Sequence, residues 1–277
     1  MSVDAAHAAG FKAEPAHGEG SLRTWLENSR VLAWRQLLVY VRNVPTVLQS
    51  LIIPAVSLVL IKVVLGDAVG DATGQDSLYG TVPLMILVGA MGGSMVSAIR
   101  LNKERSTGLL ARLYVLPINR AADLTSRVVA EAVRILVVTL ILLAVGSAMG
   151  FRFSEGLPAA IALIAVPLLF GSAYAVFVLA IAVNSPAGAP LVQYLGLLMN
   201  VLMFFNSGFS PIDAYPGWLQ PIVANQPMTP GIDLMRSLAA GGPITVNLIK
   251  VLIWAAIFVG ASIYPALVGY RKAATSR

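Results

Sequence analysis

The sequence predicts an all-α integral membrane protein with six transmembrane helices. Two observations indicate this: the 277-residue chain is 57% hydrophobic and only 12% charged, and its apolar residues fall in long blocks separated by short charged stretches. A mean hydropathy of +0.80 is not that of a soluble domain. Blocks of about 20 apolar residues match a hydrocarbon layer of ~30 Å. The predicted spans are residues 44–65, 81–99, 130–150, 157–183, 190–209 and 246–269.

The N-terminal region divides into a tail and an amphipathic helix. Residues 1–21 are small and polar and contain no apolar core segment, so we expect a disordered cytosolic tail and not a signal peptide. The residues from 22 to 42 have helical periodicity, and this helix is expected to lie along the membrane surface, with an ordinary lead-in helix as the alternative. The side expected to be apolar consists of Leu22, Trp25, Leu26, Leu32 and Ala33. The residues assigned to the membrane interface are Trp25, Arg30, Trp34 and Arg35.

Proline and glycine modify several spans. Pro54 is expected to kink the first span, and the fourth is long enough to tilt or to break near Pro167. In the second span, Gly89 and Gly93 allow close approach of another helix, which we attribute to general packing. Residues 210–245 contain six prolines but are too apolar for a free loop, so short re-entrant helices in the outer leaflet are predicted between spans five and six.

The distribution of positive charge predicts the orientation. Six spans place both termini on one side, and fourteen of the 19 Lys and Arg residues fall on that side. By the positive-inside rule both termini are cytoplasmic, and the charge bias accounts for the basic composition without nucleic acid binding. The fourteen residues are Lys12, Arg23, Arg30, Arg35, Arg42, Arg100, Lys103, Arg105, Arg112, Arg120, Arg127, Arg271, Lys272 and Arg277.

The ionisable residues argue against catalysis by this chain. It has no Cys, its two histidines lie in the tail, and it has no phosphate-binding loop of the Walker type. We therefore expect no catalytic residue, no bound metal and no cofactor, and the energy for any transport must come from elsewhere. Glu131 and Arg134 are three residues apart in the third span, which favours mutual neutralisation; a role in coupling is the alternative.

The loop between spans two and three combines charges with apolar residues. Leucines recur at helical spacing from Leu109 to Leu116, and Pro117 ends the pattern. This predicts a short cytosolic amphipathic helix that binds a partner or, alternatively, lies on lipid headgroups.

This loop carries a recognisable motif. Residues 104–117 read E-R-x-x-G-x-x-x-R-L-x-x-L-P, and residues 211–221 read P-x-x-x-Y-P-x-W-L-Q-P. With the N-terminal helix and six spans, these motifs resemble the permeases of ABC-2-type ATP-binding-cassette exporters. The FRF at 151–153 and the GYRKA at 269–273 are similar to the daunorubicin-resistance-type branch of actinobacteria, whose relatives include mycobacterial exporters of complex lipids. One departure is residues 228–231, where many relatives have Tyr after Thr, so the re-entrant element could differ in shape.

The resemblance implies a function and partners. Residues 22–277 would form an ABC-2-type transmembrane domain in the bacterial plasma membrane, exporting a hydrophobic or amphiphilic compound, either a lipid or drug-like. ATP and Mg²⁺ would bind to a separate ABC ATPase subunit, and a second permease and membrane lipids would be the other partners. The residues implied to couple to the ATPase are Glu104, Arg105, Gly108, Leu110, Arg112, Leu113, Leu116 and Pro117.

The substrate path is expected where two permease copies meet along spans two and five. Span five offers flexible, aromatic and amide side chains suited to an amphiphilic cargo, although ordinary span packing also explains them. The candidate residues are Asn200, Met203, Phe204 and Asn206. An ion-coupled or energy-independent carrier is the alternative function.

Overall fold

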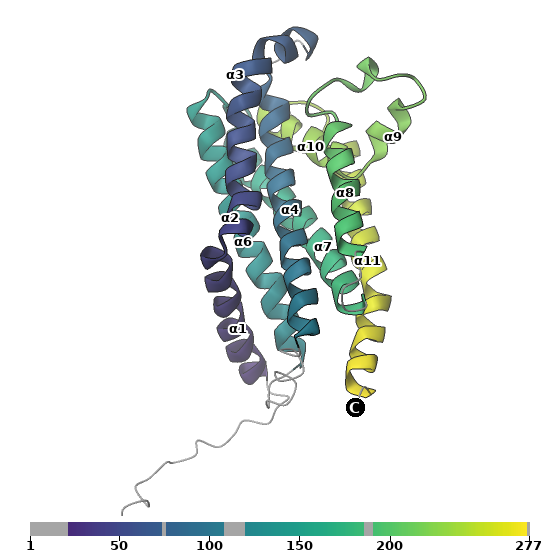
Figure 1. Ribbon diagram of the computed structural model, residues 1–277. Helices are drawn as coiled ribbons and strands as arrows, with labels where there is room; N and C mark the ends of the chain where they lie inside the picture. The colour runs from purple at the N-terminus through teal and green to yellow at the C-terminus, as the bar shows by residue number, and fades with distance from the viewer. Residues whose placement is uncertain (1–21, 74–75, 108–119, 186–190, 276–277) are drawn as a thin grey trace, which may run out of the picture.

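The computed structural model describes residues 22–73, 76–107, 120–185 and 191–275, and in these ranges the chain is helical with no strand (Figure 1). The prediction of an all-α fold is confirmed. The elements are α1 (Leu22–Arg42), α2 (Val44–Val47), the π-helix η2 (Leu48–Ile52), α3 (Ile53–Thr73), α4 (Leu78–Ser106), α6 (Arg120–Ala148), α7 (Gly156–Asn184), α8 (Leu191–Phe204), the 3₁₀ helix η3 (Ile212–Ala214), α9 (Gln220–Asn225), α10 (Met228–Ala240) and α11 (Thr245–Thr275).

Five stretches of the described chain are long and apolar enough to cross a membrane: Val44–Val64, Leu78–Glu104, Thr125–Ala148, Gly156–Asn184 and Thr245–Ile263. The predicted fifth span is present as α8, which at 14 residues extends about 21 Å. It ends early because the amide of Asn206 takes part in the following turn, donating to the carbonyl of Met203 and accepting from the N–H of Gly208.

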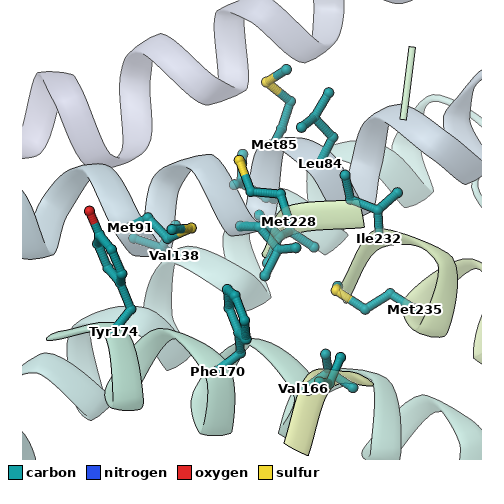
Figure 2. Close-up of a cluster of buried hydrophobic side chains, with 14 of the residues drawn as sticks. Leu84, Met85, Met91, Val138, Val166, Phe170, Tyr174, Met228, Ile232 and Met235 are labelled. Carbon is teal, nitrogen blue, oxygen red and sulfur yellow. The ribbon is translucent and has the colours of Figure 1, made fainter. Parts of the chain in front are cut away.

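α4 and α7 form the centre of the bundle, and between them they contact α3, α6, α8, α10 and α11. α10 packs against both central helices, so the predicted re-entrant element contributes to the core. Gly241 ends α10 in a backbone conformation with φ +86° that favours glycine. Figure 2 shows where α4, α6, α7 and α10 meet, around Leu84, Met85, Met91, Val138, Val166, Phe170, Tyr174, Met228, Ile232 and Met235.

α1 runs lengthwise beside α6 and below α3 in Figure 1. Its buried side chains, Ser29, Ala33 and Gln36, recur at helical spacing and are small or polar. Its large apolar residues face outward instead, with Val31 68% and Trp34 63% exposed. Of the residues expected on the apolar side, Leu26 is exposed and Ala33 is buried against the bundle, so the predicted apolar side is divided between the two faces of α1.

The first span begins with an irregular helical segment. The helix stops at Arg42, Asn43 is extended (φ −95°, ψ 93°), and the chain then passes through α2 and η2 before α3 begins. Proline has no N–H and its ring crowds the carbonyl four residues earlier, so Pro54 disturbs the helix at Ser50. A π-helical segment ends at Ile52, two residues before Pro54, whereas the kink itself stays a prediction.

Two other spans differ in detail from their predicted bounds. α4 continues through Arg100 and Glu104 to Ser106, although the charges after residue 99 were expected to end the span. α7 is one continuous helix that includes Pro167, so the break considered there is absent. The extension of α4 is stabilised by a hydrogen bond from Arg100 to Gln36 of α1 and by an ion pair between Glu104 and Arg127 of α6.

Candidate functional site

A buried ion pair lies on α6. The Nη2 of Arg134 is 2.6 Å from the Oε2 of Glu131, and the two side chains are only 1% and 8% exposed. The predicted mutual neutralisation is therefore confirmed as a direct ion pair. Since removing two charges from water is costly, further hydrogen bonds are needed to satisfy the remaining donors and acceptors.

α4 supplies these hydrogen bonds. The guanidinium of Arg134 donates to the carbonyl oxygens of Gly89 and Ala90 at 3.1 and 2.7 Å. The Ser94 hydroxyl accepts from Arg134 at 3.0 Å, and the hydroxyls of Ser94 and Ser97 both donate to Glu131. These four residues of α4 and the pair on α6 join two spanning helices through charge-assisted bonds.

Glycine at two positions of α4 makes this approach possible. A Cβ atom on Gly93 would lie 2.0 Å from the Nη1 of Arg134, so only glycine leaves room for the guanidinium. A Cβ atom on Gly89 would lie 2.7 Å from the carbonyl oxygen of Ser50, in the π-helical break. The two glycines attributed to general packing thus accommodate α6 on one side and the first span on the other.

The polar network continues to the charged end of the bundle, where α1, the last turns of α4 and the first turns of α6 lie. Arg100 donates to the Oε1 of Gln36 on α1 at 2.5 Å, and its Nε is 3.7 Å from Glu104. Glu104 also accepts from Arg127 of α6 at 3.0 Å. Glu104 is therefore an anchor between α4 and α6.

The other residues predicted to couple to an ATPase lie at or beyond the end of α4. Arg105 is in the last turn of that helix. The remaining six lie outside the described residues: Gly108, Leu110, Arg112, Leu113, Leu116 and Pro117.

A groove of about 480 Å³ separates the first span from α8, with α4 as its floor. Of the predicted substrate-path residues, Asn200 and Met203 line it. Phe204 is 64% exposed on α8 and Asn206 is buried in the turn after α8, so neither contributes to the lining. The complete lining is Pro45, Leu48, Gln49, Ile53, Pro54, Ser57, Met85, Val88, Met91, Gly92, Met95, Gly196, Met199, Asn200, Met203 and Met228.

Methionine dominates this groove. Six of the nine methionines in the chain line it, together with two glycines and the polar side chains of Gln49, Ser57 and Asn200. Methionine adapts its shape to irregular apolar ligands. The α4 and α10 residues were not predicted, although methionine pairs four residues apart, at 91 and 95 and at 199 and 203, are a usable signal for a flexible apolar stripe.

A second groove, of about 860 Å³, runs between α1 and α6. Three of the four predicted interface residues, Trp25, Arg30 and Trp34, line it with apolar side chains of both helices. Arg35 is partly buried elsewhere on α1.

A second, half-buried cluster lies at the α10 end of the bundle. Arg236 of α10 is 3.0 Å from Asp233 and donates to the carbonyl of Ser207 at 2.5 Å. The Ser207 hydroxyl donates to Asp233 at 2.6 Å. Gly80 of α4 fits against this cluster, since a Cβ atom there would lie 2.5 Å from the carbonyl of Gly208.

Comparisons with known proteins agree with the helical architecture. Residues 27–239 match the family described as "ABC-2 type transporter". The chain is 39% identical over 253 residues to the "Probable doxorubicin resistance ABC transporter permease protein DrrC" of Mycobacterium tuberculosis (strain ATCC 25618 / H37Rv), covering 91% of this chain and 90% of the relative. It is 21% identical to the "Daunorubicin resistance ABC transporter permease protein DrrB1" of Streptomyces coeruleorubidus, covering 75% and 73%.

Proposed function

The chain belongs to the ABC-2 type transporter family, and from this premise we propose that it is the permease subunit of an ATP-driven exporter whose ATPase site lies on a separate subunit. ATP and Mg²⁺ would bind to that partner, and this chain would supply the path through the membrane. The observation that carries the proposal is the long similarity to a permease named as a drug-resistance ABC transporter protein.

The partner ATPase would dock at the charged end of the bundle. The network from Glu131 to Glu104 ties the ends of α1, α4 and α6 together, so a push at residues 104–117 would reach the spans as one movement. The arrangement of basic residues supports a cytoplasmic position for this end and for both termini, in the plasma membrane of a bacterium.

The methionine-lined groove is the proposed substrate path. Its volume and mixed apolar and amide lining suit an amphiphilic compound, such as a lipid or a drug-like molecule with a planar polar group. A second permease copy would close the open side of the groove, because α3 and α8 both expose apolar side chains there, including Val56 and Leu197.

Doxorubicin is a suitable probe because a relative's name refers to resistance to it. The complex with the ATPase subunit that copurifies with this chain is reconstituted into vesicles, and ATP-dependent doxorubicin movement is measured. Met199→Trp would fill the groove and lower transport about tenfold, the equivalent of the ~1.4 kcal/mol that overfilling a site costs. Leu252→Trp, on the exposed face of α11, is the matched control and should leave transport unchanged.

Two outcomes contradict the proposal. Equal transport by the Met199→Trp variant and the wild type would remove the groove as the path. Export that persists without ATP and stops when the ion gradient is collapsed would favour an ion-coupled carrier instead.

A further inference from the structure

The break in the first span joins two helices that contact different parts of the bundle. α1 packs on α6 at the charged end, whereas α3 and η2 pack mainly on α4 and only lightly on α6. Between them, over residues 43–52, the backbone changes from α-helix to an extended residue, then to one α-helical turn and to a π-helix. Irregular helical segments of this kind concentrate backbone adjustment at a few residues.

A hydrogen bond spans this break. The hydroxyl of Tyr40, in the last turn of α1, is bonded to the hydroxyl of Ser50 in η2. Ser50 already donates its single proton to the carbonyl oxygen of Thr46 at 2.7 Å. Tyr40 is therefore the donor and Ser50 the acceptor in the bond between them. Because Ser50 is fully buried, loss of the Tyr40 hydroxyl is not repaired by bulk water.

Arg134 contacts the same tyrosine. Its Cζ lies 5.9 Å from the centre of the Tyr40 ring, in cation–π range. The guanidinium is itself fixed by Glu131 and by the carbonyls of α4. One side chain thus contacts α1, α4 and α6 at the point where the first span is interrupted.

The contact between α1 and the rest of this region leaves room for one water molecule. A cavity of about 20 Å³ is lined by Gln36 and Tyr40 of α1 and by the charged groups of α4 and α6. A site needs roughly 10–15 Å³ and two to four polar partners to hold a water. The face of α1 that would separate is therefore polar, with room for a water molecule beside it, and the bonds across it can be exchanged for bonds to water.

We infer that the break at Asn43–Ile52 is a hinge for α1, and that Tyr40 and Arg134 are positioning residues for transport that hold this hinge closed against α4 and α6. In the closed state the Tyr40–Ser50 bond and the Arg134–Tyr40 contact fix α1 relative to the spans. When the hinge opens, bonds to water replace these interactions, and the movement of α1 is transmitted to α4. The role in transport rests on the proposed function, whereas the hinge itself does not.

The hinge is tested on the chain alone. The protein has no native Cys, so Ala33→Cys places a single thiol on the side of α1 that faces α6, where Ala33 is 5% exposed. Labelling with N-ethylmaleimide reports separation of the two helices. Tyr40→Phe removes only the hydroxyl, and Arg134→Lys keeps the charge but not the forked donors. Both should accelerate labelling about fivefold, the effect of losing one net hydrogen bond.

Thr139→Val is the matched control. Thr139 is buried in α6 and its hydroxyl has no hydrogen-bond partner among the described residues, so labelling at residue 33 should be unchanged. Unaltered labelling in Tyr40→Phe overturns the hinge, and that variant decides the question if Arg134→Lys does not fold. Equal acceleration in all three variants indicates general loosening and also overturns it.

The role in transport is tested on the complex with its ATPase, using doxorubicin as the probe. Tyr40→Phe should raise the number of ATP molecules hydrolysed per doxorubicin moved about fivefold. A purely structural residue would lower both activities in proportion to the folded protein and leave their ratio constant. An unchanged ratio therefore overturns the positioning role. Absence of any ATP-driven transport in the wild-type complex would contradict the proposed function but not the labelling result.

Discussion

Two regions of the bundle, the middle of α6 and the α10 end, contain the same kind of ion pair at different depths of burial. Each has a carboxylate and an arginine three residues apart on one helix, Glu131–Arg134 on α6 and Asp233–Arg236 on α10. In each, α4 provides a glycine at the point of contact, and serine hydroxyls complete the bonding. The α6 pair is 1–8% exposed and lies beside the broken span, whereas the α10 pair is 21–27% exposed and fixes the turn after α8.

This difference in burial predicts that loss of one member destabilises the two pairs by different amounts, and that the pairs have different structural roles. A fully desolvated pair must keep both members, because a lone buried charge is highly unfavourable. A pair that water reaches is screened, and its loss is milder. We expect the α6 pair to govern the relative position of spanning helices and the α10 pair to secure a local segment.

The largest expected effect is from Glu131→Ala. This change leaves the Arg134 charge buried without a carboxylate and should lower the free energy of unfolding by about 3–5 kcal/mol. Urea unfolding of the purified protein in detergent, followed by tryptophan fluorescence, measures this loss. Asp233→Ala is the matched variant at the α10 end, and it should lower the free energy of unfolding by less than half as much. Equal losses would remove the distinction between the two clusters.

A double variant sharpens the same comparison. Glu131→Leu combined with Arg134→Leu removes both charges and should recover most of the stability lost by Glu131→Ala, because no unpaired charge remains. A double variant as unstable as the single one would show that the surrounding bonds of α4, and not the pair, hold the helices together.

An intermediate effect is expected at Gly80. In Gly80→Ala the new methyl group meets the carbonyl oxygen of Gly208 at 2.5 Å and the Nη2 of Arg236 at 2.8 Å. The overpacking should lower the free energy of unfolding by about 1–3 kcal/mol, measured by the same denaturation. Gly217→Ala is the control, since nothing lies within 4 Å of its Cβ position. An unchanged free energy of unfolding in Gly80→Ala would show that the α10 end rearranges around the added methyl group without loss of stability.

The smallest effect belongs to a third ion pair, between Lys62 and Asp76 at 2.8 Å. Partial burial opposes ionisation of Asp76, but hydrogen bonds from the N–H of Leu78 and from Lys62 prevail and lower the pKa of this carboxyl below 3.8. Its stabilisation is therefore complete above the unfolded pKa and is lost as the pH falls through the lower, folded pKa.

Asp76→Asn should consequently lower the melting temperature slightly at pH 6, by an amount equivalent to at most about 1 kcal/mol for so exposed a pair. The difference from the wild type should shrink as the pH falls through the lowered, folded pKa of Asp76. A difference that persists at low pH would mean that the carboxylate charge is not its origin.

The sequence predicted the fold class and the Glu131–Arg134 pair because both follow from local spacing. The helix of the second span continues past its predicted end at residue 99, since Arg100 bonds to Gln36 on α1 and Glu104 pairs with Arg127 on α6, contacts between helices that have no local signal. The faces of α1 were predicted from hydropathy, for a helix lying along the membrane surface. In a membrane the outward face is also apolar, so periodicity alone does not distinguish the two sides.

The candidate site was only partly predictable, because the composition of a span identifies residues within that span but not which spans meet. Asn200 and Met203 could be proposed from the composition of one span, but the groove also requires residues from α4, α10 and the first span. Their meeting depends on tertiary packing. The π-helix could be anticipated only as a disturbance near Pro54, because the contact of Ser50 with Gly89 is long-range.

The distribution of side chains between the two faces of α1 has an energetic consequence. Ser29, Ala33 and Gln36 contact the bundle, while Val31 and Trp34 face outward. Sideways movement of such a helix in contact with lipid leaves its outward apolar face where it was and separates only the small and polar side chains from the bundle. The free-energy barrier to this movement then comes from breaking a few polar contacts. It does not include exposing apolar surface to water, so moving α1 sideways costs less free energy than releasing it into water.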